Sequence, residues 1–222
     1  MRVLVTGASG FLGSHIAEQL AHAGQTVRAL VRKTSNRKFL EKLPSLEFAE
    51  GSIEDRDSVE RAMDGVDAVI HSAGIVKARN EDEFHATNVR GTANVIESAV
   101  ARAPGLKRFV HVSSLEAAGP SADGSPVPVD QEQPITRYGK SKLLAEKEVY
   151  RHKDRVPVTI LRPTGIYGPR DTEMFDIFKS VKSGVLPITG DGESRVTLVY
   201  GPDAARACIR AIDADVPSGS TF

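Results

Sequence analysis

Thr6-Gly7-Ala8-Ser9-Gly10-Phe11-Leu12-Gly13 is the stretch that decides the fold we predict, and it lies almost at the start of the sequence. It follows the apolar run Arg2-Val3-Leu4-Val5 and leads into a segment in which Ile16 and Leu20 share one helical face. A strand, a glycine turn and a helix in this order are typical of dinucleotide-binding folds, because glycines permit a tight turn and a close approach to a pyrophosphate. The helix N-terminus then offers unpaired N–H groups to the phosphates. The Gly-x-x-Gly-x-x-Gly spacing matches the commoner Gly-x-Gly-x-x-Gly fingerprint only in part.

Composition and charge narrow the class of protein. The 222 residues are 40% hydrophobic and 26% charged, which suits one large core or one domain with part of a second. Lys plus Arg and Asp plus Glu number 29 each, so a nucleic-acid or anionic-membrane partner has no electrostatic support. Strand-forming residues begin at position 2 and no apolar run reaches membrane-spanning length, so we expect no signal peptide and a cytoplasmic protein. We predict that the single cysteine, Cys208, is a small buried residue in a helix, and we predict no metal site.

Strand and helix patterns alternate as far as Leu161. We predict strands at residues 2–5, 26–31, 46–50, 67–71, 107–114 and 156–161. Helices are predicted after the glycine turn and over residues 55–63, 81–101 and 135–150, and Gly91 is a point where the long third helix could be interrupted. This alternation predicts an α/β fold in which a doubly wound parallel sheet carries helices on both faces.

Beyond Leu161 the alternation loosens. We predict, in order, a glycine- and proline-rich loop, a helix, an extended segment, a second helix and the beginning of a further strand, at residues 162–170, 174–183, 196–200, 202–212 and 218–222. The chain is therefore divided into a dinucleotide-binding domain at residues 1–165 and a small, incomplete C-terminal substrate-binding lobe at residues 166–222. The returning strand and helix of that lobe lie near residues 196–212.

Chemistry-bearing residues recur where the predicted strands end. Parallel sheets bind ligands at the carboxyl ends of their strands. The repeated placement of these residues at strand ends is therefore stronger evidence for a ligand site than any one motif. The residues are Gly7, Arg32, Ala73 with Gly74, Ser113 with Ser114, and Pro163 with Thr164. The Pro/Ser/Asp-rich loop at residues 119–134 has a length that more often covers a site than merely joins two elements.

Tyr138 and Lys142 lie four residues apart at the start of a predicted helix, so both side chains can point into the same cleft. A tyrosine pKa is ordinarily about 10, and a nearby ammonium lowers it toward the range of general acid–base catalysis. Ser113 or Ser114 could hydrogen-bond a substrate oxygen. A Tyr-x-x-x-Lys pair alone is most often a chance pairing on a solvated helix, but the glycine turn and the strand-end serines favour the functional interpretation.

Taken together, these motifs resemble the extended short-chain dehydrogenase/reductases, also called NAD-dependent epimerase/dehydratases, which have a Rossmann fold. The likeness rests on the glycine turn, His71 to Gly74, Asn88 to Asn94, Ser113-Ser114, Tyr138 with Lys142, and Leu161 to Pro169. The second strand with Arg32 and the segment Leu161 to Gly165 are similar to the dihydroflavonol-reductase and 3β-hydroxysteroid-dehydrogenase branch.

By this resemblance Tyr138 is the catalytic acid/base, while Lys142 binds the nicotinamide ribose and lowers the tyrosine pKa. Counting back five residues from Gly119 selects Ser114 as the hydroxyl that polarises the substrate. Asn88 matches a catalytic-site asparagine that braces the long helix, although a structural helix-bend residue could equally stand there. The residues that would contact the cofactor are Gly7, Ser9, Gly10, Phe11, Leu12, Gly13, Arg32, Ser52, Ile53, Ala73, Gly74, Val112, Ser113, Tyr138, Lys142, Pro163, Thr164 and Ile166.

The end of the second strand indicates which dinucleotide is bound. NAD-binding proteins place an acid there for the ribose hydroxyls, whereas this chain has Val31-Arg32-Lys33 and no acid before Glu41. An arginine fork matches phosphate oxygens, so we predict NADP(H), with Arg32 on the 2′-phosphate and Lys33 or Ser35 assisting. A merely solvated basic loop is the alternative, in which case NAD(H) stays a candidate.

Two positions depart from the family pattern. Ser52 stands where many members have an aspartate near the adenine, which puts the adenine contact in doubt. Arg195 lies one residue further from Asp203 than the arginine that sugar-nucleotide enzymes put against their substrate. Its role as a diphosphate ligand is weakened accordingly.

The resemblance leaves three functions open. The first is an NADP(H)-dependent reductase or dehydrogenase acting on a small-molecule ketone or secondary alcohol, and the second is a nucleotide-sugar epimerase with tightly bound NAD. A dehydratase is disfavoured, because Ser114-Leu115-Glu116 supplies at most one of its two acids. The third is a non-catalytic dinucleotide sensor, against which the intact Ser114, Tyr138 and Lys142 argue. A homodimer through the two long helices, 81–101 and 135–150, is implied by resemblance alone.

Overall fold

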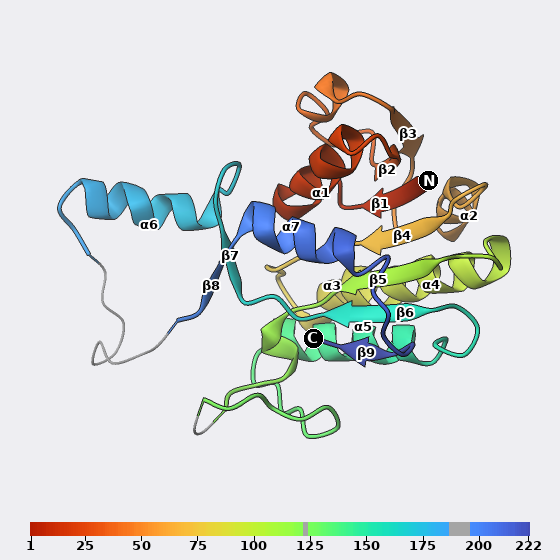
Figure 1. The fold of residues 1–222 in the computed structure, drawn as a ribbon. Helices are drawn as coiled ribbons and strands as arrows, with labels where there is room; N and C mark the ends of the chain where they lie inside the picture. Colours follow the sequence, from red (N-terminus) through yellow and green to blue (C-terminus); the bar gives the residue numbers. More distant parts are fainter. Residues whose placement is uncertain (122–123, 187–195) are drawn as a thin grey trace.

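A parallel sheet of seven strands forms the centre of the computed structural model, which describes residues 1–121, 124–186 and 196–222 (Figure 1). In spatial order the strands are β3 (Leu46–Glu50), β2 (Thr26–Val31), β1 (Arg2–Thr6), β4 (Ala68–His71), β5 (Arg108–Val112), β6 (Val158–Leu161) and β9 (Ser220–Thr221). The strand order reverses beside β1, which pairs with β2 on one side and with β4 on the other. In such sheets a ligand crevice opens at the reversal, outside the carboxyl ends of the strands.

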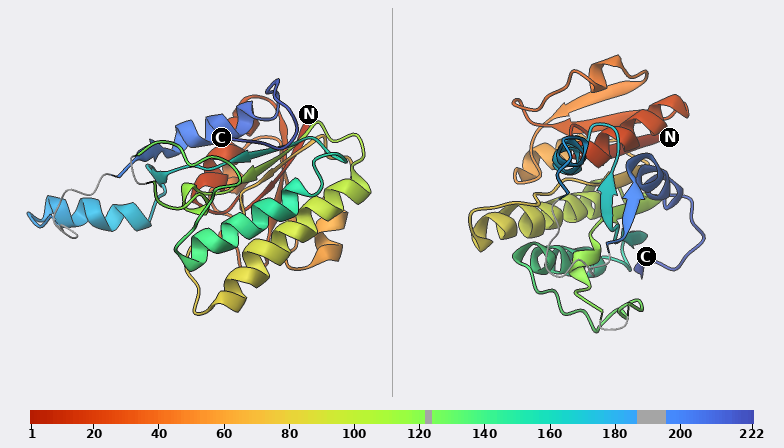
Figure 2. Two further views of the ribbon diagram at one scale, coloured as in Figure 1. Left: turned by 90° about the horizontal axis from the view of Figure 1, so that it is seen from below. Right: turned by 90° about the vertical axis from the view of Figure 1, so that its left-hand side faces the viewer.

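Helices cover both faces of the sheet and make three layers (Figures 1 and 2). The helices α1 (Phe11–His22) and α7 (Gly201–Arg210) lie on one face, and α2 (Arg56–Ala62), α4 (Gly91–Arg102) and α5 (Arg137–Tyr150) lie on the other. Along β1 the side chains alternate between two cores: Val3 and Val5 pack in the core beneath α1 and α7, and Leu4 packs in the opposite core. Burial on both faces explains the continuous apolar strands.

The structure confirms the α/β class, the doubly wound parallel sheet and the six predicted strands. The long helix predicted over residues 81–101 is present in three pieces. These are α3 (Glu81–Phe84), the π-helical turn η2 (His85–Arg90) and α4, so the interruption comes just before Gly91. Short 3₁₀ turns, η1 (Leu40–Lys42) and η3 (Leu115–Ala117), complete this part of the chain. Among the described residues no helix is long and apolar enough to cross a membrane.

The C-terminal segment divides between two places. The predicted glycine- and proline-rich loop contains a short strand, β7 (Gly165–Tyr167), which pairs in parallel with β8 (Leu198–Tyr200). The helix α6 (Glu173–Lys182) projects away from the sheet and buries none of its residues (Figure 1). By contrast, α7 packs on α1 and β9 joins the edge of the main sheet beside β6. The predicted division at residue 165 stays a prediction, and Arg195 lies outside the described residues.

Cys208 is buried in α7, as predicted. Burial raises the pKa of its thiol to about 12. A thiol that stays protonated at neutral pH is a poor nucleophile, so Cys208 acts as a small core residue.

Candidate active site

The glycine turn between β1 and α1 makes a close backbone cradle. Gly7 has a φ of +72°, and a Cβ placed on it would lie 2.8 Å from the backbone nitrogen of Ala73. A Cβ on Gly13 would lie 2.1 Å from the carbonyl oxygen of Gly7. No side chain caps the first turn of α1 by a hydrogen bond. The turn therefore has the open N–H groups and the small residues that a pyrophosphate requires.

A first cavity, which we call the dinucleotide groove, runs along this turn. Its volume is about 380 Å³. It reaches from the glycine turn to the ends of β2, β3 and β4. The predicted cofactor-binding residues that line it are Gly7, Ser9, Gly10, Phe11, Leu12, Gly13, Arg32, Ser52, Ile53, Ala73 and Gly74.

A second cavity, which we call the catalytic cleft, has a volume of about 750 Å³. The predicted residues that line it are Phe11, Leu12, Gly74, Val112, Ser113, Ser114, Tyr138, Lys142, Pro163, Thr164 and Ile166. The cleft and the dinucleotide groove share four lining residues, namely Phe11, Leu12, Ser72 and Gly74. A single continuous groove thus joins Arg32 at one end to Tyr138 at the other.

Tyr138 lies in the first turn of α5, which Thr136 caps by accepting a 2.8 Å hydrogen bond from the backbone of Gly139. Gly139 brings α5 against η3, since a Cβ on it would lie 2.4 Å from the carbonyl oxygen of Glu116. Ser114 and Tyr138 line the same cleft, and the Ser114 side chain acts on the pKa of Tyr138. Serine and tyrosine hydroxyls therefore converge in the cleft, which is the arrangement needed to bind one substrate oxygen.

Burial raises the pKa of Tyr138; the hydrogen bond with Ser114 lowers it, and the charge of Glu116 raises it further. The net direction is upward, so the phenol is a proton donor at neutral pH. The expectation that Lys142 lowers this pKa is not met in the structure, because desolvation outweighs the favourable contacts and the lysine is not among the groups that shift it.

Lys142 is buried beneath the cleft, and its Nζ donates a 2.8 Å hydrogen bond to the carbonyl oxygen of Val112. Burial lowers the pKa of Lys142 to about 8, and the Glu146 carboxylate acts in the opposite direction. The side chain is therefore a cation at pH 7 and becomes neutral as the pH rises above about 8.

Asn88 lies in the π-helical turn and lines neither cavity. Its Oδ1 accepts a 2.9 Å hydrogen bond from the backbone of Ile75, and its Nδ2 donates to the Ile75 carbonyl and to the Ser141 hydroxyl. The side chain thus ties the loop after β4 to α5. This geometry favours the bracing role over direct contact with a substrate.

Ser113 and Ser114 are neighbours with different partners. The Ser113 hydroxyl donates to the buried carboxylate of Glu146, so it is already engaged below the floor of the cleft. Ser114, in contrast, lines the cleft together with Tyr138 and caps η3 by accepting from the backbone of Glu116. Of the two hydroxyls, Ser114 is the one placed to meet a substrate.

The cations of the basic loop after β2 differ in whether they form an ion pair. Lys33 and Arg37 both pair with Glu50, at 3.7 Å and 3.4 Å. Arg32 lines the dinucleotide groove, is exposed, and has no ion pair within the described part of the chain. The hydroxyl of Ser35 accepts a hydrogen bond from the backbone of Arg32. Among the described residues Arg32 is therefore an unpaired cation that lines the dinucleotide groove and can meet a phosphate there.

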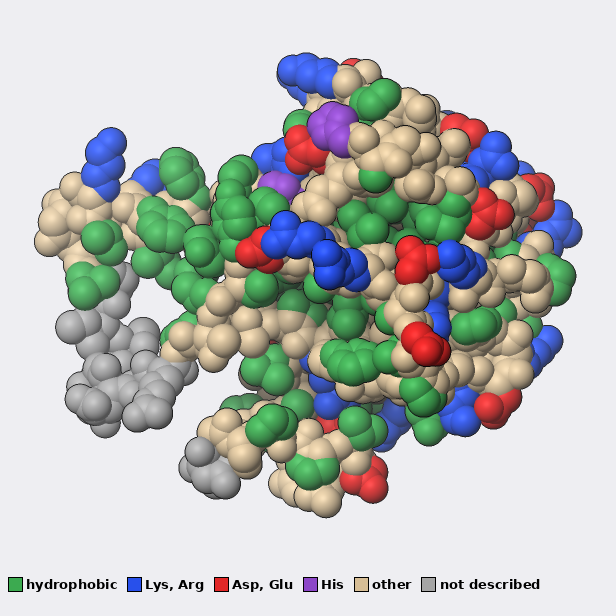
Figure 3. Space-filling view, viewed as in Figure 1, with side chains coloured by type: hydrophobic (Ala, Val, Ile, Leu, Met, Phe, Trp, Pro, Cys, Tyr) green, Lys and Arg blue, Asp and Glu red, His purple; other side chains and the backbone are tan. Residues whose placement is uncertain are grey.

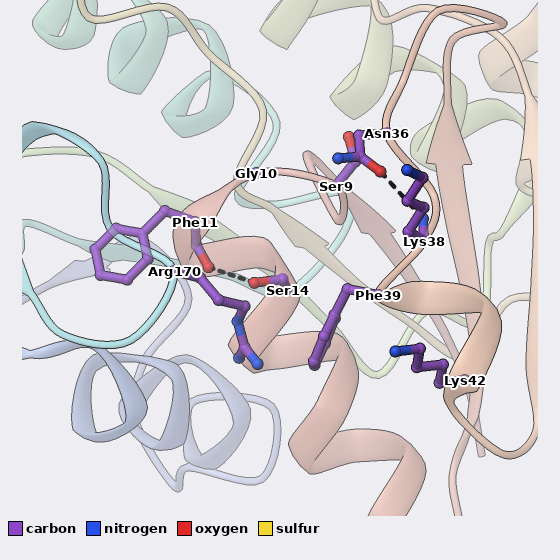
Figure 4. Close-up of a pocket in the computed structure, with 9 residues that line it drawn as sticks. All are labelled: Ser9, Gly10, Phe11, Ser14, Asn36, Lys38, Phe39, Lys42 and Arg170. Carbon is purple, nitrogen blue, oxygen red and sulfur yellow. Dashed lines mark hydrogen bonds between the residues drawn. The ribbon is translucent and has the colours of Figure 1, made fainter.

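The structure also shows a basic recess that the sequence did not reveal, beside the glycine turn (Figure 4). Its volume is about 390 Å³, and it is lined by Ser9, Gly10, Phe11, Ser14, Asn36, Lys38, Phe39, Lys42 and Arg170. Arg170 lies 4.0 Å over the ring of Phe39 and pairs with Glu18 at 2.7 Å. In the sequence, only the basic run at residues 32–38 pointed to this recess, because Arg170 comes from a loop that is distant in the sequence.

The fold and the site together define a class: a Rossmann-type sheet with Ser114, Tyr138 and Lys142 at its crevice is typical of the extended short-chain dehydrogenase/reductases. The chain belongs to the NAD dependent epimerase/dehydratase family, whose model matches residues 3–222. Its site residues keep the roles given above as predictions.

Named relatives and a solved structure are consistent with this membership. The chain is 36% identical over 204 residues to a ceramide reductase of Caulobacter vibrioides and covers 91% of itself and 58% of that protein. It is 32% identical over 238 residues to a 3 beta-hydroxysteroid dehydrogenase/Delta 5-->4-isomerase of Mycobacterium tuberculosis. This alignment covers 99% of the chain and 62% of that protein. A UDP-glucuronic acid 4-epimerase from Bacillus cereus, solved with NAD, superposes with a TM-score of 0.87 at 26% identity. The superposition covers 100% of the chain and 76% of that structure. The chain thus spans less than two thirds of these two curated relatives.

Proposed function

We propose that the protein is an NADP(H)-dependent reductase or dehydrogenase that interconverts a ketone and a secondary alcohol. The observation that carries the proposal is the continuous groove from Arg32, a cation unpaired among the described residues, to Tyr138, whose phenol keeps its proton at neutral pH. Two relatives named as a reductase and a dehydrogenase support it.

The residues of the cleft would divide the chemistry among them. The nicotinamide, when bound, supplies or accepts the hydride. Ser114 and Tyr138 hold the substrate oxygen by hydrogen bonds, and Tyr138 gives its proton to that oxygen during reduction. The raised pKa of Tyr138 keeps this proton available at pH 7. Below about pH 8 Lys142 is a cation, and by the family resemblance it would bind the nicotinamide ribose.

The dinucleotide would lie in the groove with its pyrophosphate at the N-terminus of α1. Arg32 is our proposed ligand of the 2′-phosphate, and the recess with Lys38 and Lys42 adds positive charge beside it. Lys33, which we expected to assist, is paired with Glu50. NADP(H) is therefore the preferred cofactor, with NAD(H) as the alternative.

The cofactor test is a comparison of dissociation constants for NADPH and NADH by fluorescence titration. We expect NADPH to bind at least about tenfold more tightly, a difference of about 1.4 kcal/mol. Arg32→Ala should remove most of that preference, whereas Lys33→Ala, a neighbouring cation held by Glu50, should leave it. Equal affinity for the two nucleotides in the unsubstituted protein would overturn the NADP(H) assignment.

The activity test uses NADPH oxidation with a panel of ketones. Turnover supports the reductase. A bound cofactor that is released only on denaturation would support the second candidate, an epimerase with NAD, which the similarity to the UDP-glucuronic acid 4-epimerase favours. NADPH binding without turnover of any carbonyl would indicate the third candidate, a dinucleotide sensor.

The assembly and location of the protein also stay proposals. We propose a homodimer through α4 and α5, because Leu144 and Tyr150 are exposed apolar side chains on α5. A monomer mass by light scattering would contradict it. A cytoplasmic location is proposed from the sequence alone.

A further inference from the structure

The mouth of the catalytic cleft carries exposed apolar side chains from four separate segments. Val76 follows β4, Leu115 is in η3, Ile135 precedes α5 and Val196 precedes β8; we call these residues the apolar wall. They are between 48% and 76% exposed. Apolar side chains also gather along α6 and at its junction with the body of the molecule (Figure 3). Apolar residues that converge on a cleft indicate a ligand that covers them.

The charged side chains of the cleft are mostly acidic. Glu116 accepts a 2.7 Å hydrogen bond from Thr136, and Asp171 accepts from the backbone at the start of α6. Glu173 is neutralised by Lys77. Among the described residues that line the cleft, Lys142 is the only lysine or arginine.

Lys142 cannot serve as a surface cation for a phosphate. Its ammonium is buried and is held by the carbonyl oxygen of Val112. A nucleoside-diphosphate sugar carries two or more negative charges that need cationic or N–H partners. In this cleft such a substrate would meet Glu116 and Asp171 instead. The charges of the described residues that line the cleft therefore disfavour such a substrate.

We propose that the substrate is a neutral, lipid-like ketone or secondary alcohol, whose oxygen lies at Ser114 and Tyr138 and whose apolar body lies on the apolar wall. This inference rests on the proposed function and narrows its substrate class. In reduction the carbonyl carbon gains a hydride from NADPH, and the oxygen gains the proton of Tyr138. The products are a secondary alcohol and NADP⁺, and the phenolate takes a proton back from water.

The test measures binding apart from turnover. Titration calorimetry on the protein saturated with NADP⁺ compares 2-butanone, 2-heptanone and 2-undecanone with UDP-glucose. Each CH₂ that is buried on the wall should tighten binding by up to about fourfold. UDP-glucose should bind more weakly than 2-undecanone by at least about tenfold.

Variants locate the binding surface. Val76→Ser or Ile135→Ser should weaken 2-undecanone by about threefold or more, since each removes apolar area from the wall. Val129→Ser is the matched control, because Val129 is 57% exposed against 58% for Val76 and lines no part of the cleft. It should leave 2-undecanone affinity unchanged.

The outcomes separate the two proposals. Three results would overturn the proposal of a lipid-like substrate. In the first, ketone affinity does not rise with chain length; in the second, UDP-glucose binds as tightly as 2-undecanone; in the third, neither compound binds. A wall covered by another segment of the protein would give the first of these results. Length-dependent binding without NADPH oxidation would support the substrate class and overturn the reductase.

Discussion

Arg162 and Glu146 form a two-point ion pair directly below the catalytic cleft. The Nε and Nη2 of Arg162 donate to the two carboxylate oxygens of Glu146 at 3.0 Å and 2.6 Å, and both side chains are buried. Arg162 also donates to Glu132 at 2.6 Å, and Ser113 donates to Glu146. The guanidinium at the end of β6 thus binds α5 through Glu146 and the loop at residues 119–134 through Glu132, and Glu146 in turn binds Ser113 after β5.

Removal of this guanidinium should lower the stability of the fold. Arg162→Met leaves the carboxylates of Glu132 and Glu146 buried without their cation, so we expect a loss of about 3–5 kcal/mol in the free energy of unfolding. Arg151→Met, which breaks an exposed pair with Glu148, should cost less than about 1 kcal/mol. Urea unfolding measures both. An Arg162→Met variant as stable as the unsubstituted protein would show that the ion cluster does not hold the site together.

Glu132 should make this contact sensitive to acid. Burial raises its pKa, but the hydrogen bond and charge of Arg162 outweigh that effect and lower it. A carboxyl whose pKa is lower in the folded state stabilises the fold above its ordinary pKa, and that contribution is lost as the pH falls through the lowered value. Glu132→Gln should therefore remove part of the stability at pH 7, and its effect should become smaller as the pH falls. Urea midpoints measured as the pH is lowered from 7 test the prediction, and parallel curves for the two proteins would contradict it.

Two buried histidines should add a second acid sensitivity. His71 and His111 stack at 5.3 Å between β4 and β5. Burial lowers the pKa of His71 from 6.5 to about 3 and that of His111 well below its ordinary value, and the Lys142 charge acts in the same direction. Below pH 6.5 the unfolded chain takes up protons that the folded chain does not, so the protein becomes less stable as the pH is lowered. Between pH 6.5 and the lowered pKa, each histidine reduces the folding equilibrium constant by up to about tenfold per pH unit.

The His111 variant isolates one of these groups. Neither ring nitrogen of His111 has a hydrogen-bond partner among the described residues, so His111→Leu loses no polar contact there. The variant should lower the pH slope of stability below pH 6.5 by about one proton. An unaltered slope in His111→Leu would mean that this imidazole takes up its proton without unfolding.

The order of strands and helices could be predicted because their patterns are local. The run Val3 to Val5 and the turn from Gly7 to Gly13 carry their own signals, and the serines and the Tyr138 pair follow from a family likeness spread over the chain. The parallel sheet then places the strand ends together without any knowledge of side-chain contacts.

What the sequence did not reveal depends on contacts between distant segments. The direction of the Tyr138 pKa follows from burial, which local pattern does not report. The partner of Ser113 is on α5, and the partner of Lys33 is on β3. Asn88 was correctly placed on the long helix, but its π-helical turn depends on the bonds to Ile75 and Ser141.

The glycine cradle gives a direct test of cofactor binding. Gly13→Ala places a methyl group 2.1 Å from the carbonyl oxygen of Gly7, so the turn must shift. We expect NADPH affinity to fall at least about tenfold, since the pyrophosphate needs the backbone in this position. Gly105→Ala, where nothing lies within 4 Å, is the control and should bind NADPH normally. Thermal unfolding of both variants separates a displaced turn from a lost fold, and unchanged affinity in folded Gly13→Ala would place the pyrophosphate elsewhere.

The proton donor is the centre of the proposed chemistry, and Tyr138→Phe tests it most directly. The substitution removes the phenol and leaves the ring, so NADPH affinity should stay within about twofold of the unsubstituted protein. The single-turnover rate of NADPH oxidation with a ketone that the protein reduces should fall by about 10²–10⁴. A variant that binds NADPH normally and reduces the ketone at the original rate would contradict the assignment of Tyr138 as the group that protonates the substrate.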